Sequence, residues 1–319
     1  RRRAVLVDRK MGCFVLPGGD KIGEALEEGT VLDGELTYNL TLKRQVFICF
    51  DLLCWGKDSY MNNTFADRLD VLARVAFERY NDAVKGGRIN LEETTPMVKK
   101  EFYPRREIGR LMKRFREEDG GRVFHDAAAA ARRHHRSDGV ILQPNAAYEV
   151  GTHTELFKWK WADAVTVDLE VTLRGDSDRL QLACGGPQGR AVDVTALVCL
   201  GEADQLRLAA DARDHAHAPP PPGGGGDGAN GGGGPGPVIA EIAFDTDTGM
   251  WTYKMLRPDK NQPNYVTTVM STMIELAEGI CGEELQYRMS ASHPSRDDWG
   301  TQLKKMQGKA VLFRMQKPV

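Results

Sequence analysis

Short apolar segments bounded by turn residues recur along the whole of this 319-residue chain. In residues 165–173 the apolar side chains stand at every second position, at Val165, Val167, Leu169 and Val171. A period of two is typical of half-buried β-strands. Strand-like segments lie at 4–15, where a turn separates two strands, and at 31–37, 45–53, 140–142, 156–161, 165–173, 180–184, 191–199, 238–244 and 250–255. The chain is therefore predicted to fold largely as β-sheet.

Three longer segments have helical spacing instead. Their bounds are 64–84, 105–118 and about 266–279. Apolar residues recur at intervals of three and four in the first two, which is the pattern of a helix with one buried face. These residues are Phe65, Leu69, Leu72, Val75, Ala76, Ile108, Leu111, Met112 and Phe115.

The length of the chain allows two domains, because one domain typically holds about 100–200 residues. We place the boundary near residues 163–166, where a new series of strands begins. Several short strands followed by one helix, over 166–290, predict a small barrel of the OB type. A run of prolines and glycines within 214–237 cannot bury enough apolar surface to order itself, so we expect a disordered insertion there. Residues 291–319 form a basic tail.

Composition excludes several classes of protein. Lysine and arginine (43) nearly balance aspartate and glutamate (45), so any contact with nucleic acid must be local. The six cysteines form no Cys-x-x-Cys pair, which argues against a zinc site or a disulfide framework and favours a reducing compartment. No segment approaches the roughly 18 uninterrupted apolar residues of a membrane span, so we expect no membrane partner.

Carboxylates stand beside glycine at two strand-like segments. Val31-Leu32-Asp33-Gly34-Glu35-Leu36 and Ser137-Asp138-Gly139-Val140 share this pattern, and glycine permits close approach of a ligand or of another backbone. Phe50-Asp51 adds an aromatic residue and an acid at the end of a third strand. Taken singly, the first motif is more often an ordinary turn, and Phe50 more often a core residue than a base-stacking platform.

Two further motifs carry positive charge. Phe157-Lys158-Trp159-Lys160-Trp161 alternates lysines with aromatics, so both lysines lie on one face of a strand, roughly 7 Å apart. Two ammonium groups at that separation repel unless they share an anion, which favours a phosphate clamp over a solvated strand face. Residues 251–260 end in Arg257-Pro258-Asp259-Lys260, a loop that is either simply solvated or a second anion site.

In this order, the motifs resemble the covalent nucleotidyltransferase superfamily, which comprises mRNA capping enzymes and ATP-dependent DNA and RNA ligases. The resemblance covers most of residues 4–280. FKWK at 157–160 and Arg-x-Asp-Lys at 257–260, followed by Pro263-Asn264, are closer to the capping guanylyltransferases. The fold class implied is α+β: an ATP-grasp-like nucleotidyltransferase domain with antiparallel sheets over 1–165, followed by the OB domain.

The resemblance also implies a role for each matching residue. It assigns Arg9 to the ribose, Glu35 to the ribose and metal, Phe50 to stacking on guanine, Lys100 to the guanine carbonyl, Asp138 to the metal, Lys158 and Lys160 to the α-phosphate, and Arg257 and Lys260 to the β- and γ-phosphates. Stacking on Phe50 would hold any purine. A donor such as Lys100 would choose guanine, because guanine offers an acceptor where adenine offers an amine.

The chain departs from the family pattern at its nucleophile. The family's lysine lies in a KxDG motif upstream of the arginine that Arg9 matches, and only eight residues precede Arg9. Each Asp-Gly pair in the chain has another residue at the lysine position, namely Val31, Glu117, Arg136 and Gly225. Arginine stays protonated and cannot take over the attack. We therefore expect a truncated chain whose own activity is doubtful. Met255 also stands where the family usually has another arginine.

The implied reaction is that of an mRNA guanylyltransferase. GTP would give a lysyl-GMP intermediate and pyrophosphate with Mg²⁺ or Mn²⁺, and GMP would then pass to the 5′-diphosphate end of an RNA. The C-terminal domain of RNA polymerase II is a candidate partner, and the nucleus is the expected location. Two rival hypotheses are an ATP-dependent polynucleotide ligase and a catalytically dead nucleotide- or RNA-binding scaffold.

Overall fold

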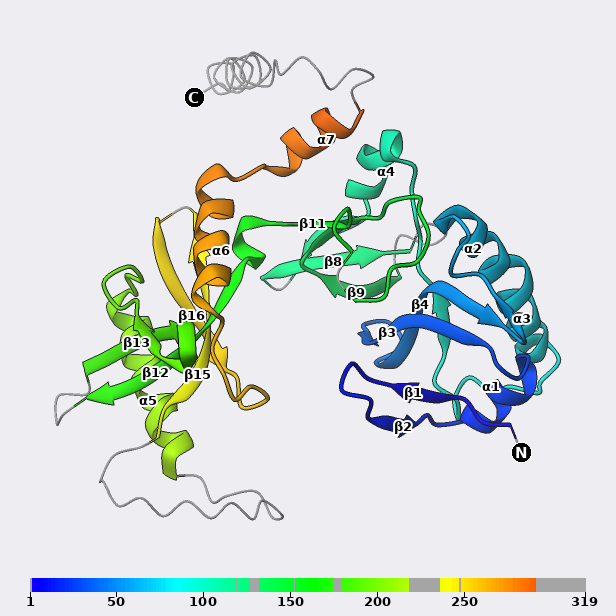
Figure 1. The fold of residues 1–319 in the computed structure, drawn as a ribbon, viewed down its shortest axis with the longest axis horizontal. Helices are drawn as coiled ribbons and strands as arrows, with labels where there is room; N and C mark the ends of the chain where they lie inside the picture. Colours follow the sequence, from blue (N-terminus) through cyan, green and yellow to red (C-terminus); the bar gives the residue numbers. More distant parts are fainter. Residues whose placement is uncertain are drawn as a thin grey trace, which may run out of the picture. The chain divides into compact units, whose positions relative to one another are not determined.

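The computed structural model describes residues 2–118, 120–126, 132–151, 153–174, 179–217, 236–246 and 248–290 (Figure 1). Its contacts divide into two compact units. The first contains the residues up to Trp159 together with those from Gln286 onward, and the second runs from Lys160 to Leu285. Both units combine helices with mainly antiparallel sheets, which confirms the predicted α+β class.

The first unit is built on a four-stranded sheet. Its strands are β3 (Val31–Asn39), β4 (Arg44–Trp55), β5 (Asp58–Ser59) and β6 (Met97–Lys99). β4 pairs antiparallel with β3 and β5, and parallel with β6. The predicted strands at 31–37 and 45–53 are thus confirmed and slightly longer. Val46, Ile48, Cys49 and Leu52 are almost fully buried, which makes β4 the central strand of this unit.

One long helical segment packs against β4 (Figure 1). It consists of α2 (Phe65–Val71), the π-helical turn η1 (Leu72–Phe77) and α3 (Glu78–Lys85). Thr64 caps its first turn by accepting a hydrogen bond from the Asp67 backbone N–H, a typical N-terminal cap. Leu72, Ala76 and Tyr80 join the strand residues in one core cluster, together with part of α1 (Gly19–Ala25). The predicted helix over 64–84 is confirmed.

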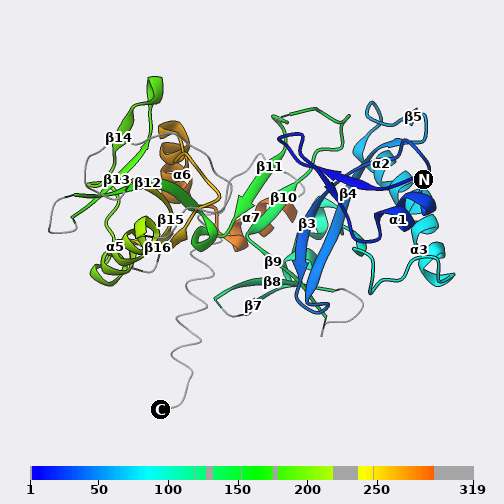
Figure 2. The same cartoon turned by 90° about the horizontal axis from the view of Figure 1, so that it is seen from below.

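The remaining strands of this unit form smaller sheets. β1 (Val5–Val7) and β2 (Cys13–Val15) are the predicted hairpin near the N-terminus. β10 (Gly139–Leu142) pairs with β11 (Phe157–Lys160). Figure 2 shows the three-stranded sheet of β7 (Phe115–Glu118), β8 (Gly121–His125) and β9 (Arg133–Ser137).

The predicted helix over 105–118 is wrong beyond Met112. A 3₁₀ turn, η2 (Arg105–Glu107), leads into the short helix α4 (Ile108–Met112), and Phe115 then lies in β7. Gly120 adopts a positive φ of 72° in the tight turn between β7 and β8. The residue pair Asp119-Gly120 is a strong hairpin signal, and the pairing of β7 with β8 overrides the helical spacing.

The second unit contains a five-stranded antiparallel sheet in the order β14-β13-β12-β15-β16. Its strands are β12 (Thr166–Arg174), β13 (Arg179–Gly185), β14 (Ala191–Asp193), β15 (Val238–Asp245) and β16 (Met250–Leu256). The alternation seen in the sequence puts Val167, Leu169 and Val171 in the core. Among the described residues β14 and β16 do not pair with each other, so closure into an OB barrel stays a prediction. A parallel bridge from Leu200 to Trp251 does bring the segment after β14 back to β16.

Helices complete this unit. They are η3 (Ala162–Ala164), η4 (Pro187–Gly189), α5 (Glu202–His217), the predicted α6 (Val266–Glu278) and α7 (Gly282–Ser290), whose last residues belong to the first unit. α5 and α6 both contribute to the core cluster of the sheet. No helix within the described ranges is long and apolar enough to cross a membrane.

Two sequence predictions in this unit are corrected. The expected strand over 191–199 ends at Asp193, because Val194 and Val198 instead make turns into the core. The disordered insertion expected over 214–237 is wrong for its first residues, because α5 extends to His217 and buries Leu208 and Ala212 against the sheet. The Pro/Gly run at 218–235 and the tail at 291–319 lie outside the described residues.

Gly34 gives a first testable prediction, because it lies at the irregularity between β3 and β4, where a side chain has no room. A Cβ at this position would lie 2.4 Å from Cζ of Phe47 and 2.5 Å from the Ile48 carbonyl oxygen. We expect Gly34→Ala to lower the free energy of unfolding by about 1–3 kcal/mol, the range for overpacking a well-packed interior. Gly109→Ala is the matched control, since its nearest neighbour is a flexible side chain 3.6 Å away. Urea denaturation of both variants tests this, and equal stability would contradict it.

Candidate active site

A β-bulge positions Phe50. In the pairing of β3 with β4, Asp33 lies opposite Asp51, but Gly34 lies opposite Cys49, so Phe50 has no partner on β3. Bulges of this kind redirect a side chain and are common beside active sites. The lack of a Cβ on Gly34 lets the two strands stay together there. The acid-glycine and aromatic-acid motifs of the sequence therefore form one structural feature.

Three of the predicted residues come together at this bulge. The ammonium nitrogen of Lys100 lies 5.4 Å from the centroid of the Phe50 ring and 3.4 Å from Oε1 of Glu35. The Lys100 backbone N–H donates to the Cys49 carbonyl at 2.8 Å, which fixes the lysine at the end of β6 beside β4. An aromatic ring, a cationic donor and a carboxylate thus lie within reach of one small ligand.

Four other predicted site residues lie on elements away from this bulge. Arg9 is exposed in the turn between β1 and β2, and Asp138 is exposed between β9 and β10. Lys158 is exposed on β11, whereas Lys160 on the same strand is partly buried. Among the described contacts, none joins Arg9 to Glu35, Phe50 or Lys100. The roles of these four residues stay predictions.

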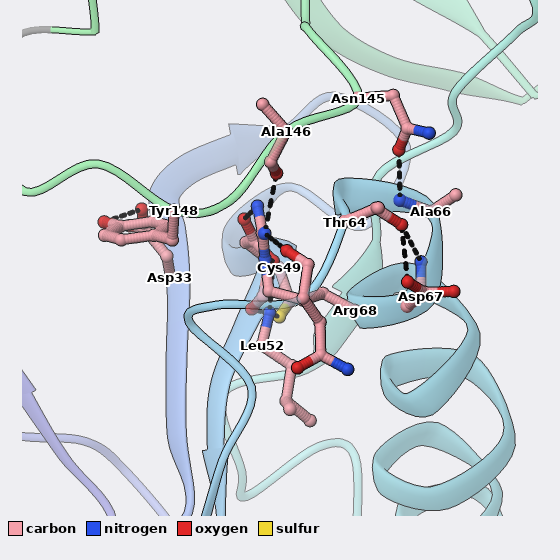
Figure 3. A network of polar contacts seen from close by, with 12 residues as sticks. Asp33, Cys49, Leu52, Thr64, Ala66, Asp67, Arg68, Asn145, Ala146 and Tyr148 are labelled. Carbon is pink, nitrogen blue, oxygen red and sulfur yellow. Dashed lines mark hydrogen bonds and ion pairs between the residues drawn. The ribbon is translucent and has the colours of Figure 1, made fainter.

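A buried ion pair between Arg68 and Asp51, which the sequence analysis missed, lies next to the bulge and holds β4 in place. Arg68 is 1% exposed and donates from Nε and Nη2 to the two carboxylate oxygens of Asp51, at 2.8 and 2.9 Å. Its Nη1 donates to the Asn63 carbonyl at 2.6 Å and the Ala146 carbonyl at 3.0 Å. Figure 3 shows Arg68 at the centre of this network. One side chain thus ties β4 to α2 and to the loop that follows β10.

The same network binds Asp33. The Tyr148 hydroxyl donates to Oδ2 of Asp33 at 2.9 Å, and Oδ1 of Asn145 accepts from the Ala66 N–H at 2.8 Å (Figure 3). Burial, followed by the neighbouring Asp33 carboxylate, raises the pKa of Tyr148 to about 12. The Tyr148 hydroxyl therefore remains protonated and keeps donating at neutral pH. Asp33 has a structural partner, and Glu35 is the carboxylate of this motif that faces Lys100.

Sequence does hold a signal for Arg68. It stands three residues after Phe65 and four before Leu72, on the apolar face of the predicted helix. A charged residue in a buried stripe requires a partner, because an isolated buried charge is strongly unfavourable. The identity of that partner, Asp51, follows only from the tertiary structure.

In the second unit, Arg257 and Lys260 lie in a cluster of carboxylates. Arg257 Nη1 lies 3.2 Å from Oδ1 of Asp168 and 3.1 Å from Oε2 of Glu241. Its Nε and Nη2 donate to the carboxylate of Asp259 at 2.9 and 2.8 Å. The Lys260 ammonium donates to the other oxygen of Asp168. The structure thus brings the two predicted phosphate-binding cations together, each with an acidic partner.

Hydrogen bonding within this cluster shifts the pKa values of Arg257 and Asp259. The hydrogen bonds from Arg257 lower the pKa of Asp259 to about 2, and hydrogen bonding to Asp259 raises the pKa of Arg257. Asp259 and Arg257 therefore stay charged at neutral pH. Two cations face three anions, so a phosphate can bind here only by replacing part of this internal pairing.

The carboxylates Glu35 and Asp138 were the predicted metal ligands. Within the described ranges no three His, Cys, Asp or Glu side chains gather closely enough to hold a metal by themselves. Mg²⁺ commonly uses one or two protein carboxylates and takes its other ligands from substrate phosphates and water. The chemistry of Glu35 and Asp138 fits that mode of binding, whereas a site made entirely of protein ligands does not fit.

Comparisons with known proteins agree with the resemblance of the motifs. The family described as "mRNA capping enzyme, catalytic domain" matches residues 1–162. The mRNA-capping enzyme subunit alpha of Schizosaccharomyces pombe is 24% identical over 303 residues, covering 91% of this chain and 68% of that protein. The protein of the same name from Neurospora crassa is 23% identical over 333 residues, covering 92% and 74%.

A solved structure, the ligase domain from M. tuberculosis LigD, is 18% identical and covers 72% of this chain and 73% of its own. Its TM-score of 0.28 is too low to support an inference. The family match, by contrast, spans half of the chain and makes it a nucleotidyltransferase, the predicted class of enzyme. The chain belongs to the mRNA capping enzyme family.

Arg68 gives the second prediction. We expect Arg68→Met to lower the free energy of unfolding by about 3–5 kcal/mol, because it leaves Asp51 charged and buried without a partner. Adding Asp51→Asn should recover part of the loss, since no buried charge then remains. Arg74→Met is the control, because Arg74 forms an exposed ion pair with Asp70 in the same helical segment. Urea denaturation measures all three, and a double variant no more stable than the single would contradict this explanation.

Proposed function

We propose that the complete protein is an mRNA guanylyltransferase that binds GTP, carries GMP on a lysine, and transfers it to the 5′-diphosphate end of nascent RNA. The capping catalytic domain match over residues 1–162 supports this most strongly. The grouping of Phe50, Lys100 and Glu35 supports it independently, because these residues have the chemistry that a guanosine requires.

Each of these residues has a distinct task in nucleotide binding. The Phe50 ring stacks on the purine, an interaction worth about 1–3 kcal/mol that does not distinguish one purine from another. Lys100 donates to the guanine O6, where adenine has an amino group that would itself be a donor. Adenine would leave Lys100 without its acceptor, and such a mismatch discriminates strongly between substrates. Glu35 orients Lys100 and accepts from the ribose.

Phosphate chemistry falls to the basic motifs. In the first step, a lysine nitrogen bonds to the α-phosphorus, the bond between the α- and β-phosphates breaks, and pyrophosphate leaves. In the second, an oxygen of the RNA diphosphate attacks the same phosphorus and releases the lysine. Lys158 and Lys160 stabilise the charge on the α-phosphate in both steps, while Arg257 and Lys260 bind the β- and γ-phosphates in the first.

Glu35 and Asp138 would hold a divalent metal, Mg²⁺ or Mn²⁺, which when bound neutralises phosphate charge and orients the leaving group. Further parts of this proposal concern the setting of the reaction. The second unit is an OB domain, the protein acts in the nucleus, and the RNA polymerase II C-terminal domain is a candidate partner.

Incubation with labelled nucleotide tests the function directly. These 319 residues contain no KxDG lysine, so we expect no covalent adduct from this chain alone. The product of the complete coding sequence should form an adduct with GTP and divalent metal, stable on a denaturing gel, and none with ATP. An adduct with ATP would favour the ligase hypothesis. No adduct with either nucleotide would favour the catalytically dead scaffold.

Lys260 gives a prediction that separates the two half-reactions. In the complete protein, Lys260→Ala should slow adduct formation by roughly 10²-fold or more, the scale for losing one preorganised charge. Isolated adduct of this variant should still pass GMP to diphosphate-ended RNA at a normal rate, because no pyrophosphate takes part in that step. Rapid-quench assays of each half-reaction measure this. Equal losses in both would show that Lys260 acts on the RNA or on the fold instead.

A further inference from the structure

Asp168 is a buried carboxylate between the two cations of the Arg257–Lys260 motif. Its side chain is 8% exposed, and it comes from β12, far from both cations in sequence. Val167 and Leu169 on either side of it are fully buried in the core, so Asp168 lies on the opposite face of the strand. A buried carboxylate is unfavourable without partners, and Asp168 does not pack in the apolar core.

The loop after β16 covers Asp168. The Asn264 side-chain oxygen accepts from the Asp168 N–H at 2.8 Å, and the Asn264 N–H donates to the Asp168 carbonyl at 2.7 Å. Both contacts use the Asp168 backbone. The carboxylate of Asp168 binds the two cations, with Oδ1 accepting from Arg257 and Oδ2 from Lys260.

The guanidinium of Arg257 binds a buried and a partly buried carboxylate through one nitrogen and an exposed carboxylate through the other two. Its Nη1 is held by Asp168 and by Glu241, which are 8% and 22% exposed. Its Nε and Nη2 donate to the carboxylate of Asp259, which is 61% exposed and so lies at the solvent side of the cluster. Phosphate binds arginine through a fork of two such hydrogen bonds. A phosphate can therefore replace Asp259 while Asp168 and Glu241 keep the guanidinium in place.

Lys260 depends on Asp168 more than Arg257 does. Its backbone N–H donates to the Arg257 carbonyl at 3.0 Å, so a tight turn places the two cations close together. Two neighbouring cations repel each other, and a lysine on a flexible stem would move into solvent. The shared carboxylate offsets this repulsion and restricts the ammonium to one position.

We propose that Asp168 is a positioning residue, which holds Arg257 and Lys260 as a preorganised pair for the β- and γ-phosphates without touching the nucleotide itself. This inference rests on the proposed function. It assigns to Asp168 a task in the pyrophosphate-releasing step and none in the transfer of GMP to RNA. A purely structural ion pair would make no such distinction between the two steps.

The test uses the complete protein with Asp168→Asn, which keeps the side-chain shape and both backbone contacts with Asn264. We expect adduct formation to slow by up to about 10²-fold, the scale for misplacing a reacting group by an ångström. Reversal of the adduct by added pyrophosphate should slow equally, because it passes through the same transition state. GMP transfer from isolated adduct should be unchanged.

Glu170→Gln is the matched control, because Glu170 lies two residues further along β12 on the same face and outside the cluster. It should leave both half-reactions at the wild-type rate. Asp168→Glu should restore part of the adduct formation rate, since it returns the charge at a slightly wrong position. If Asp168→Asn fails to fold, Glu241→Gln replaces it, with the same step affected to a smaller degree.

The outcomes separate this inference from the proposed function. If the wild-type protein forms no adduct, the proposed function has failed. If the wild type forms adduct and Asp168→Asn does so at the normal rate, or slows both half-reactions alike, then Asp168 is not a positioning residue. Thermal unfolding of each folded variant shows whether a loss of stability accompanies the change in rate.

Discussion

The buried pair of Arg68 and Asp51 is the interaction on which the candidate nucleotide site depends. Both charges are buried, so each needs partners within the protein. They bind each other, Arg68 also donates to two carbonyl oxygens, and Asp51 also accepts from the Leu52 N–H. This requirement fixes three segments at once. Asp51 directly follows Phe50, and so the arginine also holds the strand at the bulge where Phe50 leaves the regular pairing. Replacing the pair with apolar residues would fill the space but would not direct the loop carbonyls toward α2.

Both groups of candidate site residues contain their own counterions. Lys100 lies beside Glu35 in the first unit, and Arg257 and Lys260 lie among Asp168, Glu241 and Asp259 in the second. Unpaired cations at these positions would repel one another and lose their geometry. Internal carboxylates preserve the geometry of the cations, and in the proposed function a phosphate replaces the exposed Asp259. Positive and negative side chains are thus nearly equal in number over the whole chain and also lie together in each group.

Sequence patterns failed where helical spacing competed with a hairpin, and where a helix had the composition of a linker. Residues 105–118 have helical spacing, yet 115–118 pair with β8, because the hydrogen bonds to that strand stabilise β7 more than spacing alone stabilises a helix. α5 was missed because its charged and alanine-rich sequence resembles a linker next to the Pro/Gly run. Leu208 and Ala212 are buried only because α5 packs against the sheet, and the sequence does not show that contact.

By itself, the sequence determined the family, the α+β class, the main strands and two of the three predicted helices, and it named Glu35, Phe50 and Lys100 as candidate site residues. These follow from periodicity and from motif order, which are local properties of the chain. The grouping of those three residues, the partner of Arg68 and the contacts of Asp168 came only from the tertiary structure. Asp51 and Arg68 are 17 residues apart, and Asp168 and Lys260 are 92 apart. No local pattern specifies which distant charge a buried charge will meet, because that choice is made when the strands pair and the core closes.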